Sequence, residues 1–494
     1  MRTYNYSRFS KIILAILLAL PLTTLAQLDK VSYMRPSYWR PYDKTGINVF
    51  ETTKALDSIA YDGLRIRFGA GFTQQFQNLT HENTLAVNTQ SPPASGTKAQ
   101  TTTNHLYPIA PGFMTAQANL YTDVQLADGI SLNLTTYLSA RHHNEAWVKG
   151  GYLQFDKLPF KGEFWNNLMK VTTIKIGHME INYGDAHFRR SDGGHTFYNP
   201  FMESYILDAY TTEIGGEVYL KKNGLFGMLG VTSGMIKGSV DSATTTAVDK
   251  NDKRSPSIYL KGGIDKQLSD AVRVRVSGSY YHNGSNAGSG LTLYGGDRTG
   301  SNYQNVMELW KTPVYNAEKS TEANKVYDAT TQASTAIAFS GRVNPGFSKK
   351  VDAVMLNGFV KAKGLELFGT YEIAKGRSKS ETKERTASQI AMDGVYRFGK
   401  SENLFIGARY NIATVRLANT SSYIYSGDVK VDRTSFAAGW FITRNVMLKG
   451  EYVIQNYNNF EKTFKPDGSG PLTGLDYRSG GKFSGYVIEA AVAF

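Results

Sequence analysis

The fold is decided by residues 115–126, which read TAQANLYTDVQL and alternate between polar and apolar side chains. One face of an extended chain would carry Gln117, Asn119, Tyr121, Asp123 and Gln125. The other face would carry Ala116, Ala118, Leu120, Val124 and Leu126. A period of two residues is that of a β-strand, and about ten residues let a tilted strand cross a membrane. The stretch therefore predicts a membrane-spanning strand with one polar and one apolar face.

The same alternation recurs along the chain, for example in residues 130–140, 211–222 and 271–282. It predicts about sixteen strands, which begin near residues 64, 115, 130, 146, 171, 211, 225, 256, 271, 352, 364, 387, 403, 430, 445 and 482. The connections alternate between short turns and long polar stretches. That rhythm is typical of an all-β fold, a transmembrane antiparallel up-and-down β-barrel with short periplasmic turns and long extracellular loops. A soluble β-sandwich or propeller is the alternative, but such folds rarely need an apolar outer band on every strand.

Composition agrees with a barrel. The 494 residues are 41% hydrophobic with a mean hydropathy of −0.33, which is too polar for a bundle of membrane-spanning helices. A barrel wall exposes only every second residue to lipid, so its average can be polar. The chain has no Cys, which excludes disulfides, thiolate metal sites and a lipidated N-terminal cysteine. The net charge of +13 permits anionic partners, but there is no nucleic-acid motif and we expect no nucleic-acid partner.

The N-terminus predicts export. Residues 1–26 combine three cations, an apolar run over residues 12–20 and a small-residue end, the pattern of a cleaved signal peptide. A membrane anchor is the alternative, but the apolar run is far shorter than the roughly 20 residues that span a bilayer. Residues 27–62 lack alternation and mix aromatic with basic side chains. They are either a periplasmic segment or a plug that folds into the barrel. The barrel itself would occupy residues 63–494.

The last strand carries a recognisable pattern. Residues 482–494 place apolar side chains on one face and end in an aromatic residue, and the residues that define this pattern are Tyr486, Ile488, Val492 and Phe494. The pattern resembles the β-signal of Gram-negative outer-membrane proteins, which the barrel assembly machinery recognises. With about sixteen strands, the chain resembles the outer-membrane porin family, of the general or substrate-selective type. The resemblance implies an outer-membrane location in contact with lipid, and a homotrimer.

The resemblance also assigns a pore constriction. In porins the third extracellular loop commonly folds into the barrel, and here that loop is residues 182–210. Its charged and imidazole side chains are the candidates for the constriction: Asp185, His187, Arg189, Arg190, Asp192, His195 and Glu203. Opposed charges across a narrow pore would set an entry barrier for charged solutes. The alternative is a solvated loop whose charges meet only water or lipid headgroups.

The alternation also predicts which basic residues face the lumen: Arg65, Arg67, Lys175, Arg273, Arg275, Arg409, Arg433 and Lys449. Carboxylates share the same face in nearly equal number, so the sequence predicts at most a weak anion preference. Some of these cations could instead pair with acids across the wall.

These observations favour a channel for passive diffusion of small hydrophilic solutes, with no cofactor and no enzymatic activity. One alternative is a non-conducting outer-membrane barrel that acts as a binding or assembly component. A hydrolase is a further alternative, because the long stretch of residues 283–350 could carry a site, but no Gly-x-Ser-x-Gly elbow is present. His142, His143 and Glu145 share a short loop, but nothing with matching ligand spacing lies nearby, so we predict no metal site.

Overall fold

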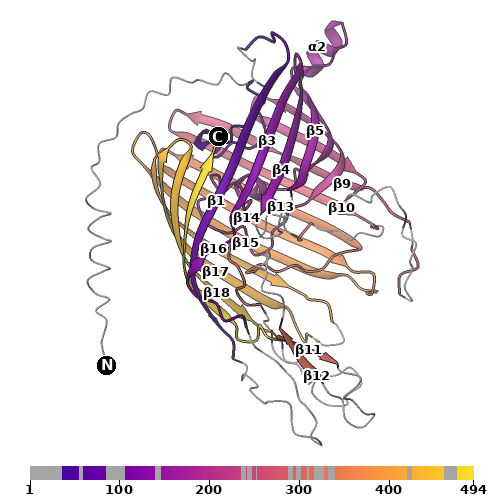
Figure 1. Ribbon diagram of the computed structural model, residues 1–494. Coiled ribbons are helices and arrows are strands. Elements are labelled where there is room, and N and C mark those ends of the chain that lie inside the picture. Colours follow the sequence, from indigo (N-terminus) through magenta and orange to yellow (C-terminus); the bar gives the residue numbers. More distant parts are fainter. Residues whose placement is uncertain are drawn as a thin grey trace, which may run out of the picture. The chain divides into compact units, whose positions relative to one another are not determined.

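A computed structural model (Figure 1) describes the chain over residues 36–54, 59–84, 106–139, 146–234, 241, 248–251, 253–286, 293–295, 302–308, 311–315, 327–331, 340–419, 425–460 and 476–494. The predicted signal peptide, residues 27–35 of the following segment and the loop with His142, His143 and Glu145 lie outside these residues.

The elements are almost all strands: β1 (Arg65–Glu82), β2 (Gly112–Phe113), β3 (Gln117–Ala127), β4 (Ile130–Ser139), β5 (Ala146–Phe155), β6 (Thr172–Glu180), β7 (Thr212–Lys222), β8 (Leu225–Thr232), β9 (Ser257–Ser269), β10 (Val272–Asn283), β11 (Lys311–Tyr315), β12 (Tyr327–Thr331), β13 (Lys350–Ala362), β14 (Leu365–Arg377), β15 (Arg385–Phe398), β16 (Leu404–Val415), β17 (Val429–Thr443), β18 (Val446–Asn458) and β19 (Lys482–Ala493). Three short helices accompany them: η1 (Lys44–Gly46), α2 (Glu163–Met169) and η2 (Ala186–Arg189).

The strands form a closed antiparallel barrel. Its sheet has 17 strands, of which β2 is a two-residue addition beside β1, and the other 16 each pair with both neighbours. The barrel closes where β19 pairs with β1, from Gly71 opposite Ala493 to Glu82 opposite Lys482 (Figure 1). Closure leaves no row of unpaired backbone groups, which a lipid environment requires. The predicted fold is confirmed, and each of the sixteen strands begins within two residues of its predicted position.

Apart from the two-residue β2, the elements that the alternation did not predict lie outside the barrel pairing. Strands β11 and β12 form a separate hairpin inside the long connection of residues 283–350. Helix α2 lies in the connection between β5 and β6, and η1 and η2 lie in segments that contact the inner wall. Each is too short to show a period in the sequence.

The two faces of the wall differ as the alternation predicted. On β3, Asn119, Asp123 and Gln125 are buried, whereas Leu120 and Leu126 are exposed. The exposed outer face includes large apolar side chains on strands all round the barrel, among them Phe68, Leu120, Ile176, Leu229, Val276, Leu356, Ile390, Ile406, Phe436 and Ile488. Such a band is what a membrane β-barrel presents to lipid. No helix within the described residues is long and apolar enough to cross a membrane.

Short turns join the strands at one end of the barrel. Asn223 and Gly224 connect β7 to β8 with φ of 53° and 80°. Positive φ at both central residues is the type I′ hairpin turn, which Asn-Gly adopts readily. The same end carries the turns between β9 and β10, β13 and β14, and β17 and β18, and an even strand number places this end on the periplasmic side.

The hydrophobic core lies inside the lumen, where residues of the third loop pack against the wall. Phe197 and Phe201 join Phe405, Phe441 and wall alanines in one cluster of buried side chains. Met202, Ile206 and Leu207 join a second cluster that contains residues of β7 to β19. A barrel of this size leaves an aqueous interior unless other segments fill it, and here the third loop occupies part of the interior as a packed layer.

Candidate functional site in the barrel lumen

Residues 37–54, here named the N-terminal belt, run along the inner wall. The belt starts beside β1 and β3, where Arg67 lies over the rings of Trp39 and Tyr42 at 5.1 Å and 4.5 Å. The Tyr42 hydroxyl donates to Asp123 of β3 at 3.0 Å. Two residues later the belt is already at the turn between β17 and β18, because the Lys44 amide donates to the carbonyl of Arg444 at 3.0 Å.

The belt then follows the wall through strands of decreasing number. The Asn48 side chain donates to Glu366 of β14, and the Asn48 carbonyl accepts from Arg273 of β10 at 3.0 Å. Glu51 forms ion pairs with Lys261 of β9 at 3.1 Å and with Arg275 of β10 at 2.8 Å. Lys54 reaches Asp156, just after β5, at 3.2 Å. The belt thus makes one circuit of the inner wall before the chain enters β1.

The third loop is held against the wall by buried polar contacts. Asp185 accepts two hydrogen bonds from Arg275, both at 2.8 Å, and pairs with Lys261 at 2.7 Å. Burial alone would raise the pKa of Asp185, but Lys261 and Arg275 together lower it below its usual value. A carboxylate held ionised by two buried cations is a firm anchor, because separating them would leave unpaired charges in the interior.

Most of the predicted lumen-facing cations serve the same purpose of holding inner segments. Arg409 donates to the Glu203 carbonyl at 2.7 Å, and Arg433 donates to the Ser204 carbonyl at 2.7 Å. Lys449 donates to the carbonyls of Asn199 and Phe201 at 3.0 Å and 2.9 Å.

Three further predicted lumen-facing cations have contacts of their own. Arg273 pairs with Asp265 at 2.7 Å, and Arg67 with Asp123. Arg65 pairs with the exposed Asp62 at 2.8 Å. With Arg275 at Asp185, seven of the eight cations are thus engaged by protein groups; the eighth, Lys175, lies elsewhere in the lumen.

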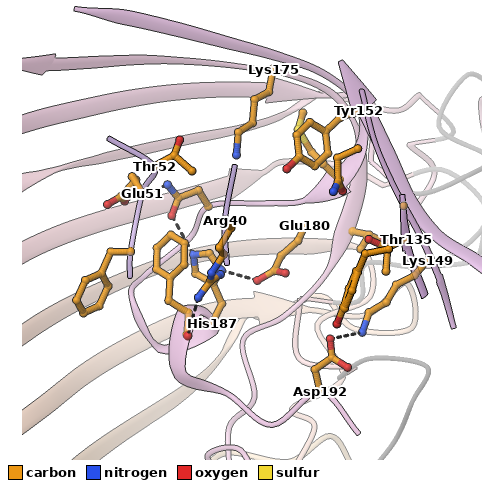
Figure 2. A pocket seen from close by; sticks show the side chains of 18 of the residues that line it. Arg40, Glu51, Thr52, Thr135, Lys149, Tyr152, Lys175, Glu180, His187 and Asp192 are labelled. Atoms are coloured by element: carbon orange, nitrogen blue, oxygen red, sulfur yellow. Dashed lines mark hydrogen bonds and ion pairs between the residues drawn. The ribbon is translucent and has the colours of Figure 1, made fainter. Parts of the chain in front are cut away.

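A cavity of about 220 Å³ remains between the belt, the third loop and the wall from β3 to β7 (Figure 2). Its lining includes Arg40 and Thr52 of the belt, and Tyr152, Lys175 and Lys221 of the wall. The clusters of buried apolar side chains include residues of β1 and of β7 to β19, and the cavity lies beside β3 to β7.

The charges in this cavity are unevenly matched. Two of the three acids that line it have a cationic partner: Glu51 has Lys261 and Arg275, and Asp192 has Lys149 at 2.8 Å. The third, Glu180, contacts the imidazole of His187 (Figure 2). Lys175 has no ion pair among the described residues, and its ammonium lies 5.0 Å and 5.2 Å from the ring centres of Tyr152 and Tyr219. Lys221 likewise has no carboxylate partner in the described part, and its ammonium donates to the Thr52 carbonyl.

Burial lowers the pKa of two histidines of the third loop. Burial lowers the pKa of His195 to about 4, and the charge of Arg40 adds to this effect. The His195 Nε2 atom lies 2.6 Å from the Tyr42 carbonyl, so this nitrogen carries the proton and joins the third loop to the belt. Burial also lowers the pKa of His187, although its contact with Glu180 opposes the change.

The seven predicted constriction residues divide into two groups. His187, Arg190, Asp192 and His195 line the cavity. Asp185, Arg189 and Glu203 do not line it: Asp185 is bound to β10, Arg189 pairs with Glu366 at 3.7 Å, and Glu203 accepts from the Asn302 amide at 2.7 Å. Of the eight predicted lumen-facing cations, Lys175 alone lines the cavity.

Sequence reasoning missed three basic residues of the cavity. Lys221 continues the inward face of β7 and could have been found by extending the alternation from Glu217 by four residues. Lys149 lies at an irregularity in the pairing of β4 with β5, where Thr135 pairs with Gly150 and Thr136 with Val148. The alternation of inward and outward side chains shifts at this point. Arg40 lies in the belt, which has no period.

The comparisons with known proteins concern the fold alone. No protein-family model and no curated protein matches the chain. Among solved structures, the chain is similar to OmpT, an outer membrane protein of Vibrio cholerae in its trimer form, at 10% identity and a TM-score of 0.46 over 88% of this chain and 100% of that one. It is also similar to OpdL of Pseudomonas aeruginosa, at 9% identity and 0.41 over 87% and 98%, and to the outer membrane channel DcaP of Acinetobacter baumannii, at 11% and 0.43 over 88% and 99%. The strand pairing and the apolar outer face of the chain itself give it the architecture of an outer-membrane β-barrel.

Proposed function

We propose that this protein is an outer-membrane channel for passive diffusion of small hydrophilic solutes, with a weak anion preference. The observation that carries the proposal is the cavity beside β3 to β7, where Glu51 and Asp192 have cationic partners while Lys175 and Lys221 form no ion pair among the described residues. A lumen lined by unpaired cations favours entry of anions over cations. His187, Arg190, Asp192 and His195 are the proposed constriction residues.

Single-channel current through purified protein in a planar bilayer tests this proposal. Defined conductance steps are expected, and their size should be small for a barrel of this strand number because the belt and the third loop fill much of the lumen. Under a salt gradient the reversal potential should indicate anion preference. Absence of current from protein shown to be folded and inserted would contradict a channel.

A second candidate is a non-conducting barrel that serves as a binding or assembly component. It is favoured by the packing of Phe197, Phe201, Met202 and Ile206 against the wall, which resembles a domain core more than a channel. Deletion of residues 37–54 separates the two candidates. If the belt only narrows an existing path, both proteins conduct and the deletion raises the conductance. If the lumen is sealed, the intact protein is silent and only the deletion variant conducts.

The remaining proposals concern export and assembly. We propose cleavage after residue 26, insertion by the barrel assembly machinery through the strand that ends at Phe494, and a homotrimer in lipid. Chemical crosslinking of native outer membranes tests the trimer, which predicts dimer and trimer bands in a fixed ratio at all expression levels.

A further inference from the structure

The cavity does not end at the belt. A second hollow of about 470 Å³ lies at the periplasmic end, bordered by the β7–β8 turn and by the start of β6. Glu51, Thr52 and Lys221 line both hollows. These three residues are therefore the partition between the lumen and the periplasmic hollow, and any solute that crosses the lumen on this side passes them.

The Lys221 side chain closes the partition. Lys221 reaches it from β7 and donates to the Thr52 carbonyl, a neutral acceptor. Glu51 is already bound by Lys261 and Arg275, and it also accepts from Asn182 at 3.1 Å. An ammonium on a carbonyl has a weaker partner than an ammonium on an anion, because charge-assisted hydrogen bonds between two ions are the stronger kind. Lys221 is thus the member of the partition that an incoming anion can recruit.

A second cation is positioned to act with Lys221. The ammonium groups of Lys175 and Lys221 each lie 5.2 Å from the centre of the Tyr219 ring, so their separation is at most twice that distance. Tyr219 is fixed because its hydroxyl donates to Glu217 at 2.5 Å. Arg40 faces the same cavity and donates to the carbonyls of Val49 and Phe188, both at 3.1 Å. Within the described part of the chain, these three cations contact carbonyls and rings and form no ion pair, and all three line the same cavity.

We infer that Lys221 is an anion-operated inner gate: a small oxyanion, carboxylate or phosphate, bound between Lys175 and Lys221 takes the Lys221 ammonium from the Thr52 carbonyl and opens the way to the periplasmic hollow. The inference rests on the proposed channel function and names its solute class. The cavity of about 220 Å³ is smaller than the roughly 300 Å³ of the smallest pockets for drug-sized ligands, so the solute is correspondingly small. Binding and release exchange noncovalent contacts only.

The test uses the full-length protein and three variants. Lys221→Gln removes the gate charge, and Lys221→Arg keeps it. Lys400→Gln removes one charge from the exposed turn between β15 and β16, at the same end of the barrel and away from the cavity, and is the matched control. Heat-dependent gel mobility and circular dichroism verify that each variant is a folded barrel.

Binding is measured first, by calorimetry on protein in detergent, with succinate and inorganic phosphate as probes and chloride as the reference. The inference predicts that at least one oxyanion binds more tightly than chloride. Lys221→Gln should weaken that binding by about tenfold, the effect of one charge-assisted hydrogen bond. Lys221→Arg and Lys400→Gln should bind like the unmodified protein. Equal binding by Lys221→Gln, or no preference over chloride, would overturn the inference.

Bilayer recordings then separate the gate from the channel. In potassium chloride, Lys221→Gln should conduct more than the unmodified protein, because Thr52 is released, and should prefer anions less. Oxyanion binding without any current would overturn the proposed channel and leave the anion site standing. Current with an unchanged reversal potential in Lys221→Gln would overturn the gate and leave the channel standing.

Discussion

Arg275 on β10 donates from Nε and from one terminal nitrogen to the two carboxylate oxygens of Asp185, each at 2.8 Å. The two residues are 90 positions apart in the chain and both are buried. The same guanidinium forms an ion pair with Glu51 at 2.8 Å. One wall residue therefore binds the third loop and the N-terminal belt together, so that the two inner segments are coupled through it.

Replacing Arg275 should loosen both segments at once. Arg275→Met leaves Asp185 and Glu51 to share Lys261, and breaking a buried ion pair costs about 3–5 kcal/mol. We expect faster proteolysis within residues 37–54 and larger conductance steps. Arg65→Gln is the control, because its partner Asp62 is exposed and such pairs contribute about 0–1 kcal/mol. Equal cleavage rates in the two variants would show that Arg275 does not hold the belt.

The approach of the third loop to β1 depends on a glycine. A Cβ atom at Gly71 would lie 2.5 Å from the Gly194 carbonyl oxygen, whereas one at Gly358 of β13 would meet nothing within 4 Å. Gly71→Ala should therefore displace the loop and lower the free energy of unfolding by about 1–3 kcal/mol, as overpacking does. Gly358→Ala should change it little. Urea unfolding of both variants in micelles compares them, and the prediction is wrong if the two midpoints agree.

Acidification should release the third loop from the belt. Because burial lowers the pKa of His195 to about 4 from its ordinary value of 6.5, the folded state favours the neutral ring. Its contribution to stability is complete above pH 6.5 and is lost as the pH falls toward 4. His187, whose pKa is also lowered, acts in the same direction.

Hydrogen exchange of residues 38–54 measures this release. Protection should fall between pH 6.5 and pH 4, after correction for the intrinsic exchange rate. The double variant His187→Gln and His195→Gln should show less dependence on pH over this range. A variant with the same pH profile as the unmodified protein would assign the effect to other groups.

The terminal residue should matter for assembly in the cell more than for the finished barrel. The Phe494 side chain is 59% exposed on the outer face, and its amide donates to the Ala70 carbonyl at 3.0 Å. Phe494→Ala keeps that backbone contact and removes the aromatic side chain of the proposed assembly signal. We expect a lower yield in outer membranes, seen by blotting, but unchanged refolding from urea into detergent. An equal loss in both would point to a structural role.

The barrel could be predicted because its determinants are local. Each strand carries its own alternation, and turns such as Asn223-Gly224 carry their own preference, so the sixteen strands follow from short windows of sequence. The predicted alternation of inward and outward side chains is wrong at Lys149, where the pairing of β4 and β5 is irregular. The irregularity depends on how β5 pairs with the neighbouring strand β4, which a short window of the β5 sequence does not contain.

The candidate site was harder to predict because its determinants are not local. Loop order placed His187, Arg190, Asp192 and His195 in the lumen but could not distinguish them from three other loop residues. Of these, Asp185 and Arg189 bind the wall, and the Glu203 carboxylate binds Asn302 of the long connection. That distinction depends on partners such as Arg275 and Glu366, far away in the sequence. The belt shows no periodic pattern in the sequence, because its successive side chains contact different strands of the wall.

The route of the N-terminal belt also constrains the order in which the molecule can be completed. Residues 43 and 44 leave the ribosome before any strand, yet their partner Arg444 belongs to the last hairpin but one, 401 positions after Asp43. The belt can reach its final position only when the wall from β5 to β18 exists to receive it. Residues 43 and 44 are therefore made before every strand of the wall but are among the last to reach their final position, because their contacts are so far apart in the sequence.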